Sequence, residues 1–379
     1  MHIGVDARLL SGPMTGIGRY TFELSKALLH HSSVGLSLYT PSPVNLATKH
    51  ELQLGGFRSG FAGNRLLRML WSQTTLPYWA SQDRIDLFWG ATHRLPRYLP
   101  PSIARVVTIH DLVWKYAPQT MRPLSLFVEK QLMPEAMQLA DLIMADSQGT
   151  ADGIAQTFPQ YMHKVRVVHL GATAPIPVSD RSSLAPLGID RPYFLFVGTL
   201  EPRKNLERLI EAYASLPASL RDQVELVIAG GKGWGGVDLK AVLQKNRLQQ
   251  SVKLVGYVNE QQLAALYANA RFLAMPSIYE GFGLPVVEAM QYGTPALVSH
   301  TGCLAEITGD AGVLVDPLSI ESIAHGLEQL MQEDDLLAAL KANALDRSEH
   351  YTWNRCATES LAVFKEAMAL RDLRMAKSL

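Results

Sequence analysis

The chain has 379 residues, of which 47% are hydrophobic and 18% charged, and its Lys plus Arg and its Asp plus Glu balance at 35 each. This length is more than one ordinary core needs and predicts two domains, while the balanced composition excludes a disordered or low-complexity protein. The two cysteines, Cys303 and Cys356, lie far apart without metal-ligand spacing, which disfavours a disulfide framework and favours a reducing compartment. The start of the chain lacks a secretory signal pattern and no apolar run is long enough to span a bilayer, so we expect a soluble or surface-attached protein.

In the first half, short β-prone runs alternate with helical patterns, which favours a parallel sheet. Strands are expected at His2–Asp6, Gly35–Tyr39, Arg105–Ile109, Leu142–Ala145 and Val165–Leu170.

Gly16 and Gly18 lie between the first expected strand and a helical pattern that runs to Leu29. The two glycines fit a simple tight turn. They equally fit a turn that brings backbone amides against a ligand. A dinucleotide site is disfavoured, because Thr21 holds the third glycine position and no acidic residue ends the second strand.

The two halves differ in charge, since residues 1–174 carry 16 Lys and Arg against 11 Asp and Glu, and the rest carries 19 against 24. Much of the basic excess lies in residues 52–105, where arginines interleave with leucines and tryptophans. Residues 58–80 fit an amphipathic helix on an anionic membrane, and equally fit a core-facing helix with a basic outer face.

His110 and Asp111 end the apolar run Val106–Ile109, so they are presented at a sheet edge. A histidine there can hydrogen-bond a sugar hydroxyl or accept a proton. A lone histidine tied to a backbone carbonyl is the commoner, structural alternative.

The segment Thr173–Asp180 has two prolines and no periodicity, which makes it the best linker candidate. Further strands are expected at Tyr193–Val197, Val224–Ala229, Val252–Val255, Arg271–Met275, Ala296–Ser299 and Val313–Val315. A helix is expected from the candidate N-cap Thr352 to about Arg371.

We therefore predict an N-terminal domain of residues 1–174, a C-terminal domain of residues 175–350, and a final helix in residues 351–379 that packs back on the first domain. Both domains are expected to be doubly wound, Rossmann-like α/β units with the ligand in a cleft between them.

Arg203 and Lys204 follow the expected strand Tyr193–Val197 and precede a helix for which Asn205 is a candidate cap. Two adjacent cations at a strand end suit a diphosphate, because Arg binds phosphate oxygens bidentately and Lys adds a movable point charge. The alternative is a solvated helix start, but cations are disfavoured beside a helix N-terminus unless an anion balances them.

Glu280 and Glu288 flank a glycine turn and a proline-started helix at the end of another buried run. Gly281 and Gly283 allow close approach of backbone to a ligand, and Pro285 suits the first helical position, which leaves N–H groups that favour phosphate. Glu288 is expected in the first helical turn, facing the same place. Alternatively, Glu288 only complements the helix dipole and Glu280 is a solvated turn residue.

Gly256, Tyr257 and Val258 follow another strand and offer backbone groups suited to a nucleobase edge. The sequence has no Asp-x-Asp dyad, Walker-type phosphate loop, Gly-x-Ser-x-Gly elbow or His/Cys cluster, which predicts a site without metal. It also lacks a nucleic-acid module, so no nucleic-acid partner is expected.

Across essentially the whole chain, these motifs resemble the retaining, nucleotide-sugar-dependent glycosyltransferases of family 4, which have the two-domain GT-B fold. The resemblance implies that residues 1–174 form the acceptor-side domain and residues 175–350 the nucleotide-sugar-binding domain. In the second half, the resemblance is carried by Gly198–Asn205, Pro276–Ala289 and Asp310–Pro317. In the first half, Gly4–Arg8, Gly16–Gly18 and Thr108–Asp111 are similar to bacterial members that transfer mannose or rhamnose in O-antigen or capsule assembly. The chain departs from the family pattern at Ala305, where proline is frequent, and at Gln148–Gly149.

The resemblance implies that Glu288 binds the donor ribose, that Glu280 contacts the transferred sugar, and that Arg203 and Lys204 hold the diphosphate. His110 is implied to lie beside the donor sugar. The predicted catalytic set is Arg203, Lys204, Glu280 and His110. The predicted donor-binding set is Glu288, Gly283, Leu284, Gly256, Tyr257, Val258, Gly16 and Gly18.

The function implied is metal-independent and cofactor-free transfer of a hexose, mannose or a related sugar, from a nucleoside diphosphate donor to a glycan acceptor that is lipid-linked. A GDP sugar is the favoured donor, and a cytoplasmic or inner-membrane peripheral location is expected. The alternatives are a non-catalytic nucleotide-sugar-binding partner and, on the same architecture, a nucleotide-sugar epimerase or a phosphorylase-like enzyme. A nicotinamide dehydrogenase is a further alternative, opposed by Thr21.

Overall fold

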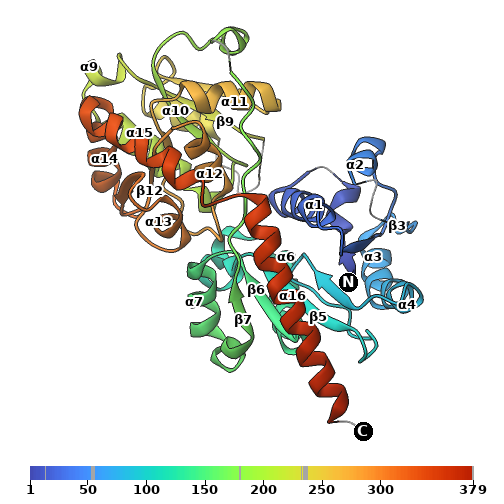
Figure 1. The fold of residues 1–379 in the computed structure, drawn as a ribbon. Helices are drawn as coiled ribbons and strands as arrows, with labels where there is room; N and C mark the ends of the chain where they lie inside the picture. Colours follow the sequence, from blue (N-terminus) through green and yellow to red (C-terminus); the bar gives the residue numbers. More distant parts are fainter. Residues whose placement is uncertain (13, 53–55, 179–180, 232, 234–237, 378–379) are drawn as a thin grey trace. The chain divides into compact units, whose positions relative to one another are not determined.

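The structure is a computed structural model that describes residues 1–12, 14–52, 56–178, 181–231, 233 and 238–377 (Figure 1). It divides into two compact units. Unit 1 comprises Met1–Trp114, Arg122–Gly171 and Thr352–Leu379, and unit 2 comprises Lys115–Met121 and Ala172–Tyr351. The change of unit at Gly171/Ala172 immediately precedes the expected linker, whose residues 179–180 lie outside the described part.

Unit 1 is built on a seven-stranded, wholly parallel sheet with the order β3-β2-β1-β4-β5-β6-β7. Its strands are β1 (His2–Asp6), β2 (Gly35–Thr40), β3 (Gly56–Ser59), β4 (Leu87–Gly90), β5 (Ala104–Ile109), β6 (Leu142–Ala145) and β7 (Val165–Val167). Its helices are α1 (Gly16–Leu29), α2 (Leu46–Glu51), α3 (Arg65–Gln73), α4 (Thr75–Gln82), α6 (Pro123–Leu139), α7 (Gln148–Thr157) and α16 (Trp353–Ala376), and the short α5 (Val113–Tyr116) lies where the chain leaves unit 1.

Unit 2 is built on a six-stranded parallel sheet with the order β10-β9-β8-β11-β12-β13. The strands are β8 (Tyr193–Val197), β9 (Glu225–Ala229), β10 (Val252–Gly256), β11 (Leu273–Met275), β12 (Ala296–Ser299) and β13 (Gly312–Val315). The helices are α8 (Leu206–Ser215), α9 (Ala218–Arg221), α10 (Leu239–Lys245), α11 (Glu260–Asn269), α12 (Leu284–Gln291), α13 (Cys303–Thr308), α14 (Ile320–Gln332) and α15 (Asp334–Ser348).

Both sheets confirm the predicted α/β class with two doubly wound domains. Central strands such as β8 and β12 are buried along nearly their whole length, as parallel strands covered by helices on both faces must be. Two strands of unit 1 were not predicted. β3 carries only one large apolar residue, Phe57, at the sheet edge, and β4 is a four-residue run too short to stand out.

The final helix, α16, begins after Thr352, whose side chain accepts a hydrogen bond from the backbone N–H of Arg355. It packs on α1 and on β4, β5 and β6 of unit 1, and Figure 1 shows it in red along the strands β5 and β6. Phe364 is fully buried in this contact and lies 6.0 Å from the ring of Trp89.

The basic, apolar stretch 58–80 divides into two helices with different surroundings. In α4, Leu76 is buried and faces the core, but in α3 the side chains of Leu66 and Leu70 are 67% and 54% exposed. On the opposite face of α3, the side chain of Trp71 is only 5% exposed and packs in the core. Core packing therefore accounts for α4 and for the Trp71 face of α3, but not for the exposed apolar face of α3. No helix in the described part of the chain combines the length and apolarity that crossing a bilayer requires.

Candidate functional site

The strand order of unit 2 brings β8 and β11 side by side, with their carboxyl ends at the same edge of the sheet. The chain leaves these adjacent strands in opposite directions along the sheet, which is the topological switch point where open α/β sheets bind ligands. The short 3₁₀ helix Pro202–Lys204 follows β8, and the turn that contains Glu280 follows β11. The two loops are joined by a backbone hydrogen bond of 2.8 Å from the N–H of Ile278 to the carbonyl of Arg203.

Three of the four predicted catalytic residues meet at this point. One oxygen of Glu280 accepts a short, charged hydrogen bond from Arg203, and the other lies 2.7 Å from Nζ of Lys204. Glu201 adds a second carboxylate, which accepts a 3.0 Å hydrogen bond from Nε of Arg203. The side chains of Lys204 and Glu280 are only 8% and 7% exposed, so the cluster is a nearly buried ion network.

The ion network fixes the charge of Glu280. Burial alone would raise its pKa, but the charges and hydrogen bonds of Arg203 and Lys204 outweigh burial and lower the pKa to about 2. Burial lowers the pKa of Lys204, and the same Glu280 carboxylate opposes that change. Glu280 is therefore an ionised, weakly basic group at neutral pH and a poor candidate for a general acid or base.

Asn205 precedes α8 as predicted, but it does not cap the helix with its side chain. Its backbone is left-handed, with φ of 62°, and its buried amide donates to the carbonyls of Pro276 at 2.9 Å and Pro317 at 2.6 Å. These carbonyls follow β11 and β13, so one side chain connects three strand ends and holds the loop that carries Lys204.

The glycine turn before α12 has the geometry expected of it. Gly283 has φ of 101°, and a Cβ atom there would lie 2.5 Å from Leu304, so both conformation and space require glycine. The helix begins at Leu284, so Pro285 is its second residue, which corrects the predicted first helical position.

The predicted position of Glu288 in the first turn of α12 is wrong. Since α12 begins at Leu284, Glu288 is its fifth residue and lies in the second turn. Its carboxylate accepts a 2.8 Å hydrogen bond from the hydroxyl of Tyr267 on α11, which fixes the side chain.

Gly256 ends β10 with φ of 70°, and its carbonyl accepts a hydrogen bond from Gly230 at 2.8 Å. Tyr257 is 87% exposed and Val258 is half-buried. All three therefore lie at the carboxyl end of the sheet, on the same edge as the ion network.

Gly16 and Gly18 form no separate turn, because they are the first and third residues of α1. Thr15 caps this helix, and its hydroxyl accepts the N–H of Gly18 at 3.2 Å. That N–H is therefore occupied, which corrects the expectation that a glycine turn presents it to a ligand.

His110 lies in unit 1, buried at the end of β5, with both ring nitrogens engaged. Nδ1 is 2.5 Å from a carboxylate oxygen of Asp146, and Nε2 is 3.0 Å from the carbonyl of Ala91. Burial lowers the pKa of His110, but Asp146 and the carbonyl outweigh it and raise the pKa overall. Because a carboxylate and a carbonyl only accept hydrogen bonds, this arrangement fits a doubly protonated ring with no nitrogen left to accept a proton.

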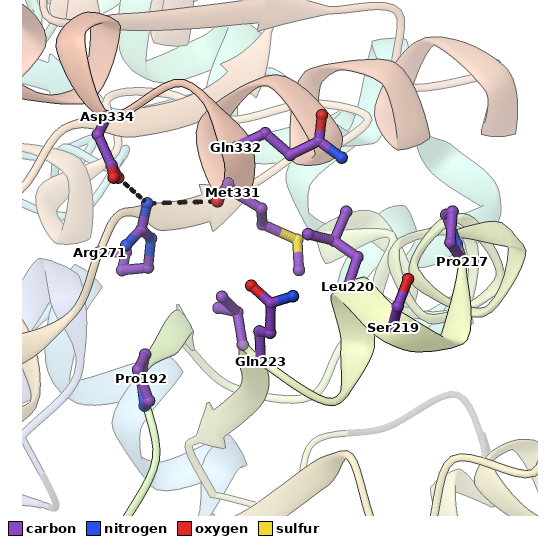
Figure 2. Close-up of a pocket in the computed structure, with 10 residues that line it drawn as sticks. Pro192, Pro217, Ser219, Leu220, Gln223, Arg271, Met331, Gln332 and Asp334 are labelled. Carbon is purple, nitrogen blue, oxygen red and sulfur yellow. Dashed lines mark hydrogen bonds and ion pairs between the residues drawn. The ribbon is translucent and has the colours of Figure 1, made fainter.

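Two cavities of unit 2 are not lined by Arg203, Lys204 or Glu280. One of about 380 Å³ is at the amino ends of the strands, where Figure 2 shows Arg271 between Asp334 and the carbonyl of Met331. The other, of about 760 Å³, is lined by Glu201 of the ion network and by Pro202 and Asn205. Its charged lining is mainly acidic and does not suit a diphosphate: Glu201, Glu207, Glu211 and Asp238 against Arg208 and Lys240. Among the described residues, no three His, Cys, Asp or Glu side chains converge to hold a metal.

Sequence reasoning missed three side chains that hold the predicted residues in place, namely Glu201, Tyr267 and Asp146. It named Asn205 as a helix cap, whereas its side chain bonds the Pro276 and Pro317 carbonyls. Glu201 and Asn205 adjoin the Arg203–Lys204 pair in sequence, and an asparagine in a loop is a frequent left-handed residue. Tyr267 and Asp146 are separated by 21 and 36 residues from their partners, and no local pattern announces such contacts.

Comparisons with known proteins agree over both units. Residues 14–173 match the family described as "Glycosyltransferase Family 4", and residues 183–347 match "Glycosyl transferases group 1". The chain is 30% identical over 377 residues to the O-antigen chain mannosyltransferase B of Escherichia coli, a similarity that covers 93% of this chain and 96% of that protein.

Solved structures share the fold. Sucrose-phosphate synthase from Thermosynechococcus elongatus superposes with a TM-score of 0.77 at 20% identity, covering 97% of this chain and 99% of that one. The Anabaena protein HepE, solved in complex with UDP and glucose, gives a TM-score of 0.73 at 20% identity, covering 97% of this chain and all of that one at 100%.

Proposed function

The chain belongs to glycosyltransferase family 4, the retaining, nucleotide-sugar-dependent enzymes of GT-B fold, and we propose that it transfers a hexose to a lipid-linked glycan in surface polysaccharide synthesis. The observation that carries this proposal is the network of Arg203, Lys204 and Glu280 at the switch point of unit 2. Two cations held at the carboxyl ends of parallel strands, beside a helix N-terminus, form a site for the diphosphate of a sugar nucleotide.

In the proposed reaction, Arg203 and Lys204 hold the diphosphate and stabilise the charge that develops on it as the bond from the sugar anomeric carbon to the phosphate oxygen breaks. The acceptor hydroxyl attacks from the same face, and its proton passes to the departing phosphate oxygen. Glu280 is then a sugar-hydroxyl ligand and not a nucleophile, since both its oxygens engage cations and its pKa is about 2.

The residues that we assign to donor binding in unit 2 lie toward the same edge of its sheet. We assign the ribose to Glu288, which Tyr267 orients, the phosphate to the backbone at Gly283 and Leu284, and the base to backbone at Gly256–Val258. His110 is assigned a positioning role beside the donor sugar, because Asp146 and Ala91 engage its ring. Gly16, the first residue of α1, is retained as a residue whose backbone approaches donor or acceptor, whereas Gly18 is not, because Thr15 accepts its N–H.

Mannose and a GDP donor are the favoured chemistry. The support is the 30% identity to an O-antigen mannosyltransferase over nearly the whole chain, together with the resemblance of Thr108–Asp111 and Gly4–Arg8 to mannosyl- and rhamnosyltransferases. Incubation with GDP-mannose, UDP-glucose and ADP-glucose, with and without a lipid-linked mannose oligosaccharide, tests this directly. The expected product is a mannose-extended lipid with retained configuration. Sugar epimerisation without acceptor, or donor binding without turnover, would favour the alternatives.

We further propose that α3, within residues 58–80, contacts the inner face of the cytoplasmic membrane. Its outer face exposes Leu66, Leu67, Met69 and Leu70, and Phe61 just before it is 93% exposed. Residues 52–82 contain three arginines and no Asp or Glu. An apolar stripe within a basic, acid-free segment is complementary to an anionic bilayer, where the lipid-linked acceptor also lies.

A further inference from the structure

Unit 1 has its own topological switch point, between β1 and β4, and a cavity lies there. The chain leaves β1 toward β2 on one side, whereas β4 continues toward β5 on the other, so the loops after β1 and β4 diverge. A cavity of about 300 Å³ is lined by Arg8, which follows β1, and by Arg94, Arg97 and Tyr98, which follow β4. Gln73 at the end of α3 and Glu135 on α6 complete its polar wall.

The polar groups of this cavity are fixed by partners on different elements. The Arg8 side chain donates three hydrogen bonds of 2.9, 3.0 and 2.6 Å to the fully buried Asp6, which also accepts one of 3.3 Å from Thr92. The backbone N–H of Arg97 donates to Oε1 of Gln73 at 2.9 Å, which leaves the Gln73 amide nitrogen as a donor. Such preorganised donors and acceptors lose little entropy when a ligand binds.

Each guanidinium of the cavity is balanced by a carboxylate. Arg97 is paired with Glu135 at 2.5 Å, Arg94 with Glu129 at 3.0 Å, and Arg8 with Asp6. The wall is therefore dense in hydrogen-bonding groups but carries little net charge. Neutralised hydrogen-bonding groups of this kind suit the uncharged hydroxyls of a sugar.

An exposed aromatic ring completes the arrangement. Tyr98 is 68% exposed at the cavity, and the hydrogen bond of 2.7 Å from Arg105 to the carbonyl of Leu99 fixes its loop. Fixed, neutralised hydrogen-bonding groups beside an exposed ring match a pyranose, whose hydroxyls are polar at the edge and whose C–H face is apolar.

We propose that this cavity binds a sugar unit of a neutral glycan. The inference deepens the proposed function and rests on it for the identification of the glycan as acceptor. Gln73 is also the last residue of α3, so the cavity adjoins the helix that we assign to the membrane surface, where a lipid-linked glycan is presented.

The test is equilibrium binding of a neutral mannotriose to the full chain without donor, compared with mannose 6-phosphate and inorganic phosphate. Tyr98→Ala and Gln73→Ala should each weaken mannotriose binding by about tenfold, as expected for one or two lost contacts. Tyr78→Ala, which removes a tyrosine that is 61% exposed on α4 outside the cavity, is the matched control and should bind like the wild type.

Unchanged mannotriose binding in both cavity variants, no mannotriose binding to the wild type, or a preference for the phosphates would each overturn the proposal. Affinity for GDP-mannose is measured in parallel on every protein. The proposed diphosphate site lies in unit 2, so a lack of GDP-mannose binding by the wild type and all variants would refute the proposed function. The mannotriose result tests the unit 1 cavity separately.

Discussion

Nζ of Lys204 lies 2.7 Å from Oε1 of Glu280, and both side chains are more than nine-tenths excluded from solvent. The two residues are 76 positions apart in the chain and meet because β8 and β11 are neighbours in the sheet. A buried ion pair of this kind costs desolvation energy that its own attraction barely offsets, so it is weak evidence for a purely stabilising role. We attribute this ion pair to function, because it holds Lys204 where the proposed diphosphate binds.

Replacing Lys204 with Met should remove the charge and keep most of the packing volume. Turnover should fall by about 100-fold or more, because a fixed cation no longer stabilises the leaving diphosphate. Lys245→Met, an exposed lysine on α10, is the control and should retain wild-type rates. Steady-state rates with GDP-mannose and lipid-linked acceptor measure the effect, and near-normal turnover of the Lys204 variant would contradict the assigned role.

Glu280→Gln should change how stability depends on pH. The ordinary pKa of 4.5 falls to about 2 in the folded protein, so the ionised group stabilises the fold fully above about pH 4.5 and loses that contribution as the pH falls toward 2. The glutamine variant lacks this dependence. Urea unfolding near pH 6 and near pH 3 should show a stability gap between wild type and variant that narrows in acid, and a constant gap would show that Glu280 is not held ionised.

Tyr267→Phe removes the 2.8 Å hydrogen bond to Glu288 and keeps the ring. If Glu288 binds the donor ribose, loss of its orienting partner should raise the Kd for GDP-mannose by about threefold to tenfold, the usual effect of one hydrogen bond. The turnover number should change little, because the ribose is remote from the reacting bond. Tyr213→Phe, whose hydroxyl bonds the Val224 carbonyl, is the control and should leave the Kd unchanged.

Asp146→Asn should convert His110 from a charged to a neutral ring. Asp146 raises the pKa of His110 in the folded protein, so the pair stabilises unit 1 below the ordinary histidine pKa and loses this contribution as the pH rises through the raised value. Thermal unfolding from about pH 6 to pH 9 should decline more steeply in wild type than in Asp146→Asn. A parallel decline would mean that His110 is neutral throughout.

The double variant Leu66→Ser/Leu70→Ser should lose binding to vesicles that contain phosphatidylglycerol, because it removes the centre of the exposed face of α3. Leu318→Ser/Leu345→Ser, two exposed leucines of unit 2, serves as control. Wild type should sediment with these vesicles and not with phosphatidylcholine vesicles. Equal sedimentation of wild type and the α3 variant, or self-association through α3 in place of vesicle binding, would argue against a membrane surface.

Local sequence was sufficient to predict most strands, the class of fold and the family, because buried parallel strands are short apolar runs and the Arg203–Lys204 and Glu280–Glu288 motifs are contiguous. It was insufficient where geometry depends on distant partners. The hydrogen bonds of Glu288 with Tyr267 and of His110 with Asp146 arise from tertiary packing. Which face of α3 is buried also depends on tertiary packing, because Trp71 enters the core and leaves Leu66 and Leu70 exposed. The turn assigned to Gly16 and Gly18 was wrong because Thr15 caps α1 directly.

The most direct test of the central claim is equilibrium binding of GDP-mannose to the wild type, to Arg203→Ala/Lys204→Ala, and to the control Lys245→Ala. Wild type and the control are predicted to bind with the same Kd, and the double variant to lose at least about 100-fold, in keeping with two charge-assisted contacts to the diphosphate. Unaltered affinity in a folded double variant would show that the diphosphate is held elsewhere, and would contradict the account.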